Sequence, residues 1–471
     1  MKLRMYIFLL CQFMAISVIG KVIPSSLISD NMVLQQQTEV RLWGRAAPNE
    51  QVKVSVSWAK KANHCTADAD GNWSILVQTP QGGGTPHSII FDDGEKTALS
   101  NILIGEVWFA GGQSNMEMPL QGFHNCPVKG SIETIADADN HPQIRMFNVP
   151  RKLSDMPQTN LEGEWRIASC ETVSQFSAVA YHFALSLQRT LHVPIGIINC
   201  SVGGSKIEGW TCREIVSHYD DIDITKKGME NTPDYLRPIV FYNAMVYPTI
   251  PYTLKGFIWY QGESNVACPD YAIRMKNMVE QWRKDRQQGE LPFYYVELAP
   301  FYYQGHQQGQ GPLLREEQYK AQKLISNSGM VCTNDLVEPY EANNVHPRDK
   351  ETVGKRLSYM ALNKTYKNEG IPCYGPEFAS MKIDGKLVRL FFNHCEMGFT
   401  RSQDIIGFEV AGDDKVFYSA DYVELQHSSW LVSSEKVPYP KAVRYCFKDY
   451  QPGNIGGMGG LPMVPFRTDD W

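Results

Sequence analysis

The chain has 471 residues, 43% of them hydrophobic and 20% charged, and its formal net charge is −6. A chain of this length and composition is typical of a globular protein with about two or three domains. The acidic balance, with no dominating basic patch, argues against nucleic acid as the main ligand.

The first 20 residues have the layout of a secretory signal peptide. Two basic residues, Lys2 and Arg4, precede an apolar run over residues 5–18, and the small residue Gly20 follows. The run is shorter than a membrane-spanning helix requires. We therefore expect residues 1–20 to be removed, the mature protein to be exported to the periplasm or the extracellular space, and no membrane span to remain.

Residues 21–100 carry short runs in which apolar and polar residues alternate. Residues 40–43 and 52–56 are examples, and turn residues such as Pro48 and Asn49 separate them. Alternation with a period of two is typical of half-buried strands. This pattern predicts a β-sandwich-like domain over residues 21–100.

From residue 101 to residue 370 the pattern changes to strands that alternate with helices. Apolar spacing predicts helices over residues 177–191, 271–286 and 349–364, and strands over residues 194–199, 254–260 and 292–298. Such alternation is typical of an α/β domain with a mainly parallel sheet. Strand patterns return at residues 386–392, 406–410 and 442–446, and predict a β-rich C-terminal domain over residues 371–471.

The cysteines suggest neither a metal centre nor a disulfide scaffold. Of the 11 cysteines, Cys11 lies in the signal segment and the others are spread singly along the chain. No closely spaced group of His and Cys is present, so we expect no metal site. Export would permit disulfides, but the sequence does not define which cysteines pair.

The segment from Gly105 to Met116 reads as an apolar strand that enters a glycine turn and ends on Ser114. The pair Gly111 and Gly112 permits a sharp backbone path, so the serine is presented and not buried. Backbone N–H groups beyond the turn can point at the atom that the hydroxyl attacks. The segment predicts a nucleophile, although an isolated serine in this position is equally typical of a helix N-cap.

Three further polar segments follow predicted strands. They contain Gly203 and Gly204, then the side-chain amides of Gln261 and Asn265, and finally His346 directly before a helix. An open parallel sheet binds its ligand beyond the carboxyl ends of its strands. Taken singly, these residues fit ordinary turns and caps. Taken together and in this order, they supply oxyanion donors and a base for the serine.

These motifs also carry a resemblance to a known family. The chain resembles the sialate O-acetylesterases of the SGNH (GDSL-like) hydrolase superfamily, and the likeness extends over nearly all of it after the signal segment. The matching motifs lie at residues 27–35, 112–116, 176–181, 193–196, 259–265, 314–318, 345–350 and 465–469.

The resemblance implies an SGNH three-layer α/β domain that works without a cofactor, flanked by the two β-rich segments. It implies Ser114 as the nucleophile and His346 as the general base. The oxyanion hole would combine the N–H of Ser114, the N–H of Gly203 or Gly204, and the side chain of Gln261 or Asn265. We also expect substrate contacts from Gln113, Glu263 and Arg315, with Arg315 facing the carboxylate of a sugar acid; the alternative for Arg315 is an ion pair with Glu316 or Glu317.

The residues before His346 depart from the family pattern. SGNH enzymes commonly carry the triad acid two or three residues before the histidine, where this chain has Asn343 and Asn344. Either one of these amides or a backbone carbonyl orients the ring, or a carboxylate folds back to it. The carboxylates in question are Asp335, Glu338 and Glu341. We favour a Ser–His dyad with a neutral orienting group.

The expected function is therefore the removal of O-acetyl groups, of the 9-O-acetyl type, from sialic acid or sialoglycans. Related acetylxylan esterases share the same motifs, so hydrolysis of acetylated xylan or another polysaccharide is the alternative activity. A carbohydrate-binding protein that kept the fold and lost catalysis is the alternative outside enzymes. Hydrolysis of a chromogenic acetyl ester separates an enzyme from such a binding protein.

Overall fold

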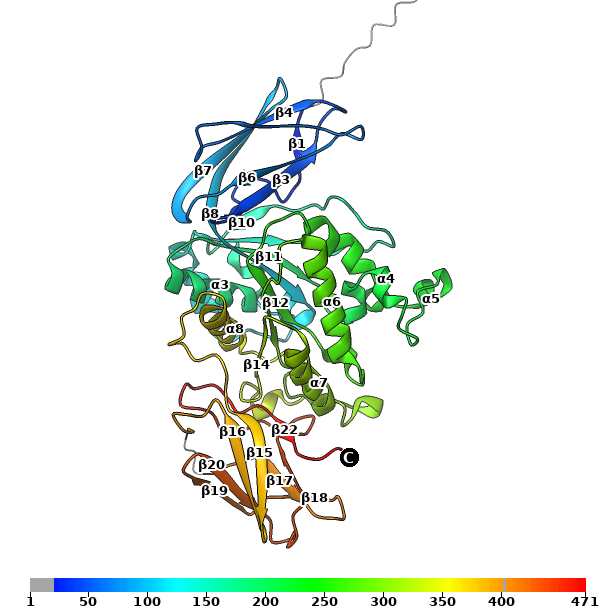
Figure 1. The fold of residues 1–471 in the computed structure, drawn as a ribbon, viewed down its shortest axis with the longest axis vertical. Helices are drawn as coiled ribbons and strands as arrows, with labels where there is room; N and C mark the ends of the chain where they lie inside the picture. The colour runs from blue at the N-terminus through cyan, green and yellow to red at the C-terminus, as the bar shows by residue number, and fades with distance from the viewer. Residues whose placement is uncertain (1–20, 401–403) are drawn as a thin grey trace, which may run out of the picture.

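The computed structural model describes residues 21–400 and 404–471, so the predicted signal peptide lies outside the described residues. Figure 1 shows three regions along one long axis. An N-terminal β region lies at one end, an α/β region in the middle and a C-terminal β region at the other end. The domain boundaries at residues 20, 100 and 370 stay predictions.

The N-terminal region is built from short strands that pair antiparallel, except β2, which pairs parallel with β8. One sheet has the order β1-β3-β6, and β4 pairs with both β5 and β7. These strands are β1 (Ile23–Pro24), β2 (Val33–Gln35), β3 (Glu39–Arg45), β4 (Gln51–Val56), β5 (Asn63–Thr66), β6 (Asn72–Gln78) and β7 (Gly83–Asp92). The long strand β8 (Lys96–Gly112) pairs with β7 and then continues into the central sheet, so it ties the two regions together.

The central sheet runs in the order β10-β9-β11-β8-β12-β13-β14. Neighbours from β9 to β14 are parallel, and only β10 at the edge is antiparallel among these strands. This confirms the predicted α/β class with a mainly parallel sheet. The strands are β9 (Ile144–Asn148), β10 (Trp165–Ile167), β11 (Ile195–Ser201), β12 (Gly256–Tyr260), β13 (Phe293–Val296) and β14 (Ser328–Val331).

Helices cover both faces of this sheet and give it three layers (Figure 1). On one face α3 (Ala178–Leu191) packs against α8 (Lys350–Lys364), and on the other α6 (Tyr271–Arg286) packs against α7 (Gly311–Leu324). Successive residues of β8 point to opposite layers: Trp108 joins the core with α3 and α8, and Phe109 joins the core with α6. The shorter helices are α1 (Ser114–Glu117), α2 (Ser131–Asp137), α4 (Arg213–Val216) and α5 (Lys226–Asn231).

The predicted long helices are confirmed, and local capping explains where two of them begin. The Ser177 side chain accepts a hydrogen bond from the N–H of Ala180, and the Asp349 side chain accepts one from Thr352. Such caps satisfy N–H groups that have no partner inside the helix. Helix α6 has the predicted bounds. Helix α7 was not among the predicted helices.

The C-terminal region packs two sheets face to face around one apolar core, so its predicted β-rich character is confirmed. The sheet orders are β15-β16-β20-β19 and β18-β17-β21-β22. Val388 and Trp430 from the first sheet meet Val410 and Val443 from the second in this core. The strands are β15 (Glu377–Asp384), β16 (Leu387–Asn393), β17 (Phe408–Ala411), β18 (Phe417–Ser419), β19 (Tyr422–Gln426), β20 (Ser429–Ser433), β21 (Ala442–Tyr445) and β22 (Phe466–Arg467).

Two further findings concern the part of the chain that the structure describes. None of its helices is both long and apolar enough to cross a bilayer. Its cysteines, from Cys65 to Cys446, are all free thiols.

Candidate active site

The strands that carry three of the predicted motifs end side by side. Gly112 at the end of β8 is in register with Ser201 at the end of β11 and with Tyr260 at the end of β12. The motif segments continue from these residues at the carboxyl edge of the parallel sheet, where ligand sites form in this architecture. The fourth segment follows β14 and carries His346 to the start of α8.

The turn before Ser114 depends on glycine. Gly112 has a φ of +140°, and a Cβ added there would lie 2.1 Å from the carbonyl oxygen of Tyr260. No other residue fits so close to a neighbouring strand without moving it. The chain therefore turns sharply, and Ser114 becomes the first residue of α1, half-buried, while Asn115 and Met116 are buried.

Asn115 joins the serine turn to the histidine loop. Its Nδ2 donates to a carboxylate oxygen of Glu263 and, over 3.0 Å, to the carbonyl oxygen of Val345. Its Oδ1 accepts a hydrogen bond of 2.5 Å from Lys350 Nζ. Ser114 and His346 are each one residue away from the bond between Asn115 and Val345. The side chain of Asn115 therefore holds the predicted nucleophile and the predicted base in one site.

The surroundings of His346 favour the neutral form of its imidazole. Its ring packs edge-on against Phe123, with the centroids 5.3 Å apart, and Nε2 is buried without a hydrogen-bond partner. Burial, and then the positive charge of Lys350, lower the pKa of His346 to about 4. The imidazole is thus unprotonated near neutral pH and able to accept the proton of a serine hydroxyl.

This lowered pKa predicts the acid limit of activity. Because only the neutral ring accepts a proton, protonation of His346 should lower kcat/KM for a small neutral acetyl ester only near pH 4. Lys350→Met removes the repelling charge but leaves the burial, so the acid limb of the pH–rate profile should move up by the smaller, electrostatic part of the shift. A pH–rate profile of each protein measures this shift. Lys355→Met, which removes an exposed lysine of the same helix, should leave the limb in place, and an unmoved limb in Lys350→Met would contradict the assignment.

The predicted oxyanion donors are not equivalent. A Cβ built on Gly203 would lie 3.5 Å from Ser114 Cβ, so this glycine borders the serine. Its N–H, however, donates to Glu117 Oε2 over 2.6 Å. Among the described residues no hydrogen bond takes up the N–H of Ser114 or of Gly204, and these two groups remain open to a substrate oxygen.

The side chains of Gln261 and Asn265 are committed to each other and to the fold. Gln261 Nε2 donates to Asn265 Oδ1 over 2.8 Å and to the carbonyl of Ser205 over 3.1 Å. Asn265 Nδ2 donates to both carboxylate oxygens of Glu208, and both side chains are buried. This network supports the loop that follows Gly204. The expectation that one of these amides faces the oxyanion is therefore replaced by a supporting role.

None of the proposed orienting groups bonds the imidazole of His346 in the described part of the chain. Asn344 Oδ1 accepts the backbone N–H of His346 at 3.0 Å, and Asn343 is exposed and makes no side-chain hydrogen bond among the described residues. Asp335 forms a bidentate ion pair with Arg356, with N···O distances of 2.7 and 2.6 Å. Glu338 and Glu341 cap a short helical turn.

Two carboxylates lie beside this histidine loop: Glu341 Oε1 accepts the N–H of Arg348 over 2.9 Å, and Glu263 is linked to Val345 through Asn115. Glu263 was not among the expected orienting groups. One of its oxygens is held by Asn115, and the other, Oε2, is buried without a partner. Burial raises the pKa of Glu263, while its hydrogen bonds and Lys350 act in the opposite direction. Gln113 also serves this segment, since its Oε1 accepts the N–H groups of Gly262 and Ser264. Both side chains, expected to bind substrate, thus face the protein.

Arg315 is buried inside the protein. It is 3% exposed on α7 and donates to the backbone carbonyls of Cys446 and Lys448. Its charge also counters the buried Glu297, whose pKa burial raises and Arg315 lowers. Arg315 therefore anchors the C-terminal region, which corrects the expectation that it binds a sugar carboxylate.

A stability measurement checks this role of Arg315. Arg315→Ala should lower the free energy of unfolding by about 2–4 kcal/mol, because buried charged hydrogen bonds are lost and Glu297 keeps no nearby cation. Urea denaturation measures this change. Residual activity should fall equally on acetylated sialic acid and on a small neutral ester, and a loss confined to sialic acid at unchanged stability would contradict the structural role.

Sequence reasoning missed several residues of this site. Glu117 follows Ser114 by three positions, so one helical turn brings it back to the same side, and this spacing was a usable signal. Asn115 and Lys350 had no local signal, because their partners lie more than 140 residues away along the chain. The described residues contain no group of His, Cys, Asp and Glu side chains arranged to hold a metal ion.

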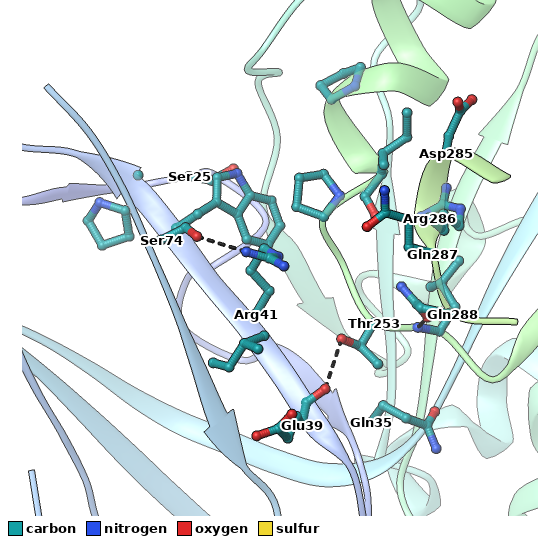
Figure 2. A pocket seen from close by; sticks show the side chains of 18 of the residues that line it. Ser25, Gln35, Glu39, Arg41, Ser74, Thr253, Asp285, Arg286, Gln287 and Gln288 are labelled. Carbon is teal, nitrogen blue, oxygen red and sulfur yellow. Dashed lines mark hydrogen bonds between the residues drawn. The ribbon is translucent and has the colours of Figure 1, made fainter. Parts of the chain in front are cut away.

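A cavity lies at the opposite end of the central strands, where they begin. It has a volume of about 1220 Å³ and is lined by residues of β3 and β6 and by those just before β12 and β13. Figure 2 shows Arg41 donating to Ser74 across 2.9 Å, and Thr253 donating to the carbonyl of Glu39. This crevice between the N-terminal and central regions is separate from Ser114, which lies at the carboxyl ends of the strands.

Comparisons with known proteins agree with this geometry. Residues 104–363 match the family described as carbohydrate esterase, sialic acid-specific acetylesterase. The human sialate O-acetylesterase is 27% identical over 387 residues, which cover 75% of this chain and 72% of that protein. The mouse sialate O-acetylesterase is 24% identical over 470 residues, which cover 86% of this chain and 83% of that protein. A crystal structure of a carbohydrate acetylesterase from Xanthomonas citri is 32% identical, covers 96% of this chain and all of that one, and superposes with a TM-score of 0.84.

Proposed function

Since the chain belongs to the sialic acid-specific acetylesterase family of carbohydrate esterases, we propose that it hydrolyses O-acetyl esters on sugars with Ser114 as the nucleophile. The observation that carries this proposal is the position of Ser114. It begins α1 at the carboxyl edge of the sheet, borders Gly203, and is tied through Asn115 to the loop of His346. A side chain that served only as a cap would need none of these neighbours.

The proposed reaction has two halves. Ser114 Oγ attacks the acetyl carbonyl carbon while His346 takes the hydroxyl proton, and the N–H groups of Ser114 and Gly204 stabilise the oxyanion. The bond from carbon to the sugar oxygen then breaks, and the imidazolium returns the proton to that oxygen. In the second half a water molecule gives its proton to His346 and attacks the acetyl–serine ester, which releases acetate and restores the serine.

Glu263 is proposed as the acid of this triad, in place of the dyad expected from the sequence. Three observations support it: its Oε2 is buried and unpaired, it shares Asn115 with Val345, and the other candidate carboxylates have hydrogen-bond or ion-pair partners of their own. A carboxylate near the imidazole stabilises the imidazolium that forms during attack. Contacts of this kind are often long before a substrate binds and shorten in the complex.

The proposed substrate is O-acetylated sialic acid, of the 9-O-acetyl type. The family description and the curated relatives support it. The second candidate is an acetylated polysaccharide, because the Xanthomonas citri relative is described only as a carbohydrate acetylesterase and matches the chain over its full length. Acetate release from 9-O-acetylated sialic acid and from acetylated xylan, at matched ester concentrations, tests the two. A higher kcat/KM on xylan would reject the sialic acid proposal.

We also propose export through residues 1–20. The support is the sequence pattern alone, a basic start followed by an apolar run and a small residue. Fractionation of cells that express the full chain, with N-terminal sequencing of the product, tests it. A protein that stays in the cytoplasm with residues 1–20 attached would reject export.

A further inference from the structure

We propose that the crevice between the N-terminal and central regions is a second binding site, which holds a neutral glycan chain and takes no part in the chemical step. The role of this site in hydrolysis rests on the proposed function, whereas the binding itself does not. Figure 2 shows Arg41 and Ser74 on the N-terminal wall of the crevice and Gln287 and Gln288 on the central wall.

Both walls offer apolar surface to a ligand. On the N-terminal wall, Leu76 of β6 lies opposite Arg41 of β3 and is 45% exposed. On the central wall, Tyr247 begins the short 3₁₀ turn η6 (Tyr247–Thr249) and is 38% exposed. The hydroxyl of Tyr247 makes no hydrogen bond within the part of the chain that the structure describes. An exposed tyrosine ring is the type of surface on which the apolar face of a sugar packs.

The charges of the lining cancel. The crevice is lined by four basic side chains, from Arg41 to Arg286, and by four acidic ones, from Glu39 to Asp285. Two of these groups are also bound by the protein, since Arg286 donates to Thr249 and the amides of two glutamines donate to Glu106. Without an excess of one sign, the crevice has no net charge to attract an ionic ligand.

Two glutamines add hydrogen-bonding groups that the fold does not use. Gln37, in the turn between β2 and β3, and Gln287, directly after α6, both line the crevice and are exposed. Among the described residues neither side chain makes a hydrogen bond. Their φ angles are +53° and +54°, a conformation that favours glycine or asparagine. Each glutamine thus strains its backbone and presents a free amide, which both donates and accepts as a sugar hydroxyl does.

Apolar surface, free amides and cancelling charges together fit a neutral sugar chain, whose rings have apolar faces and uncharged hydroxyl groups. The crevice lies at a distance from the serine that such a chain can span. Glu106 lines it, and Gly112 lies six residues further along β8, where the serine turn begins. At a rise of about 3.3 Å per residue this separation is about 20 Å. A glycan held in the crevice would therefore keep its acetylated part at a high local concentration near Ser114.

Isothermal titration calorimetry of the full chain carrying Ser114→Ala measures the binding without hydrolysis. The probes are three soluble neutral glycans: deacetylated xylan, galactomannan and N-glycans freed of sialic acid. At least one of them should bind. In the same background Tyr247→Ala should raise its Kd about tenfold. Tyr247→Phe, which keeps the ring, should leave the Kd unchanged.

Gln287→Gly separates a binding role from a structural one. Glycine relieves the positive φ, so the melting temperature should stay the same or rise, while the loss of the amide should raise the Kd about three- to tenfold. His192→Gly is the matched control, because His192 ends α3 with a φ of +56°, is exposed and lies outside the crevice. It should leave the Kd unchanged. No binding of any of the three probes, or a Kd unchanged in both Tyr247→Ala and Gln287→Gly, would overturn the site.

Kinetics with Ser114 present test the role in hydrolysis. Tyr247→Ala should raise KM about tenfold on the acetylated glycan that the wild type hydrolyses, xylan or sialoglycan, and leave 4-nitrophenyl acetate unaffected. An unchanged KM on that glycan, beside weakened binding, would overturn this role. Failure of the proposed function is distinct, since the wild type would then hydrolyse no ester while calorimetry would still report the binding.

Discussion

Replacing Ser114 with alanine is expected to lower kcat for ester hydrolysis by at least about 10⁴-fold, because no other group in the site can form the acetyl–enzyme. The substitution should not destabilise the fold. The Ser114 side chain is half-buried, and it takes part in no hydrogen bond within the described residues. The melting temperature should stay within about 2 °C of the wild type, since surface substitutions of this kind change stability little.

Hydrolysis of 4-nitrophenyl acetate, followed at several protein concentrations, measures the loss. Ser131→Ala is a matched control, since Ser131 also begins a short helix, α2, outside the site. It should keep full activity. A Ser114→Ala protein with turnover near that of the wild type would show that another nucleophile acts and would remove the basis of the proposed mechanism.

The second large effect is expected at Glu263. Glu263→Gln keeps an oxygen that can accept from Asn115 but removes the negative charge, and neutralising a triad acid costs about 10⁴-fold in turnover. Single Asp335→Asn, Glu338→Gln and Glu341→Gln variants should each keep turnover within about tenfold, equivalent to ~1.4 kcal/mol of barrier. Their carboxylates bind Arg356, a helical cap and the N–H of Arg348, and none of them bonds the imidazole among the described residues.

Steady-state kinetics on one neutral ester, with melting temperatures for all four variants, decides between the triad and the dyad. Asp335→Asn should lose stability, because it weakens the ion pair with the buried Arg356. If Glu263→Gln keeps turnover within about tenfold, the acid role is refuted and a neutral orienting group remains the explanation. A loss of several orders of magnitude at Asp335 or Glu341 would identify a different acid.

Local signals in the sequence were sufficient for most of the secondary structure and for the serine turn. Helix α6 has the predicted bounds. Ser177 and Asp349 cap α3 and α8, two helices that were predicted to begin at these residues. The turn at Gly112 could be read from the chain because its cause is local: a strand that must bend sharply needs a residue without a side chain. The α/β class was predicted in the same way, because strand patterns alternate with helix patterns along the chain.

The tertiary structure alone decided which polar side chains face a substrate. Gln261 and Asn265 lie in family motifs, but partners from other segments take up their hydrogen-bonding groups. Arg315 is buried too, although only its Nη2 has partners, in the C-terminal region. Conversely, Asn115 joins the serine turn to the histidine loop through partners that no periodic pattern indicates. The sequence determines which chemical groups a side chain carries. Whether its donors and acceptors remain free depends on groups that only folding brings within about 3 Å of them.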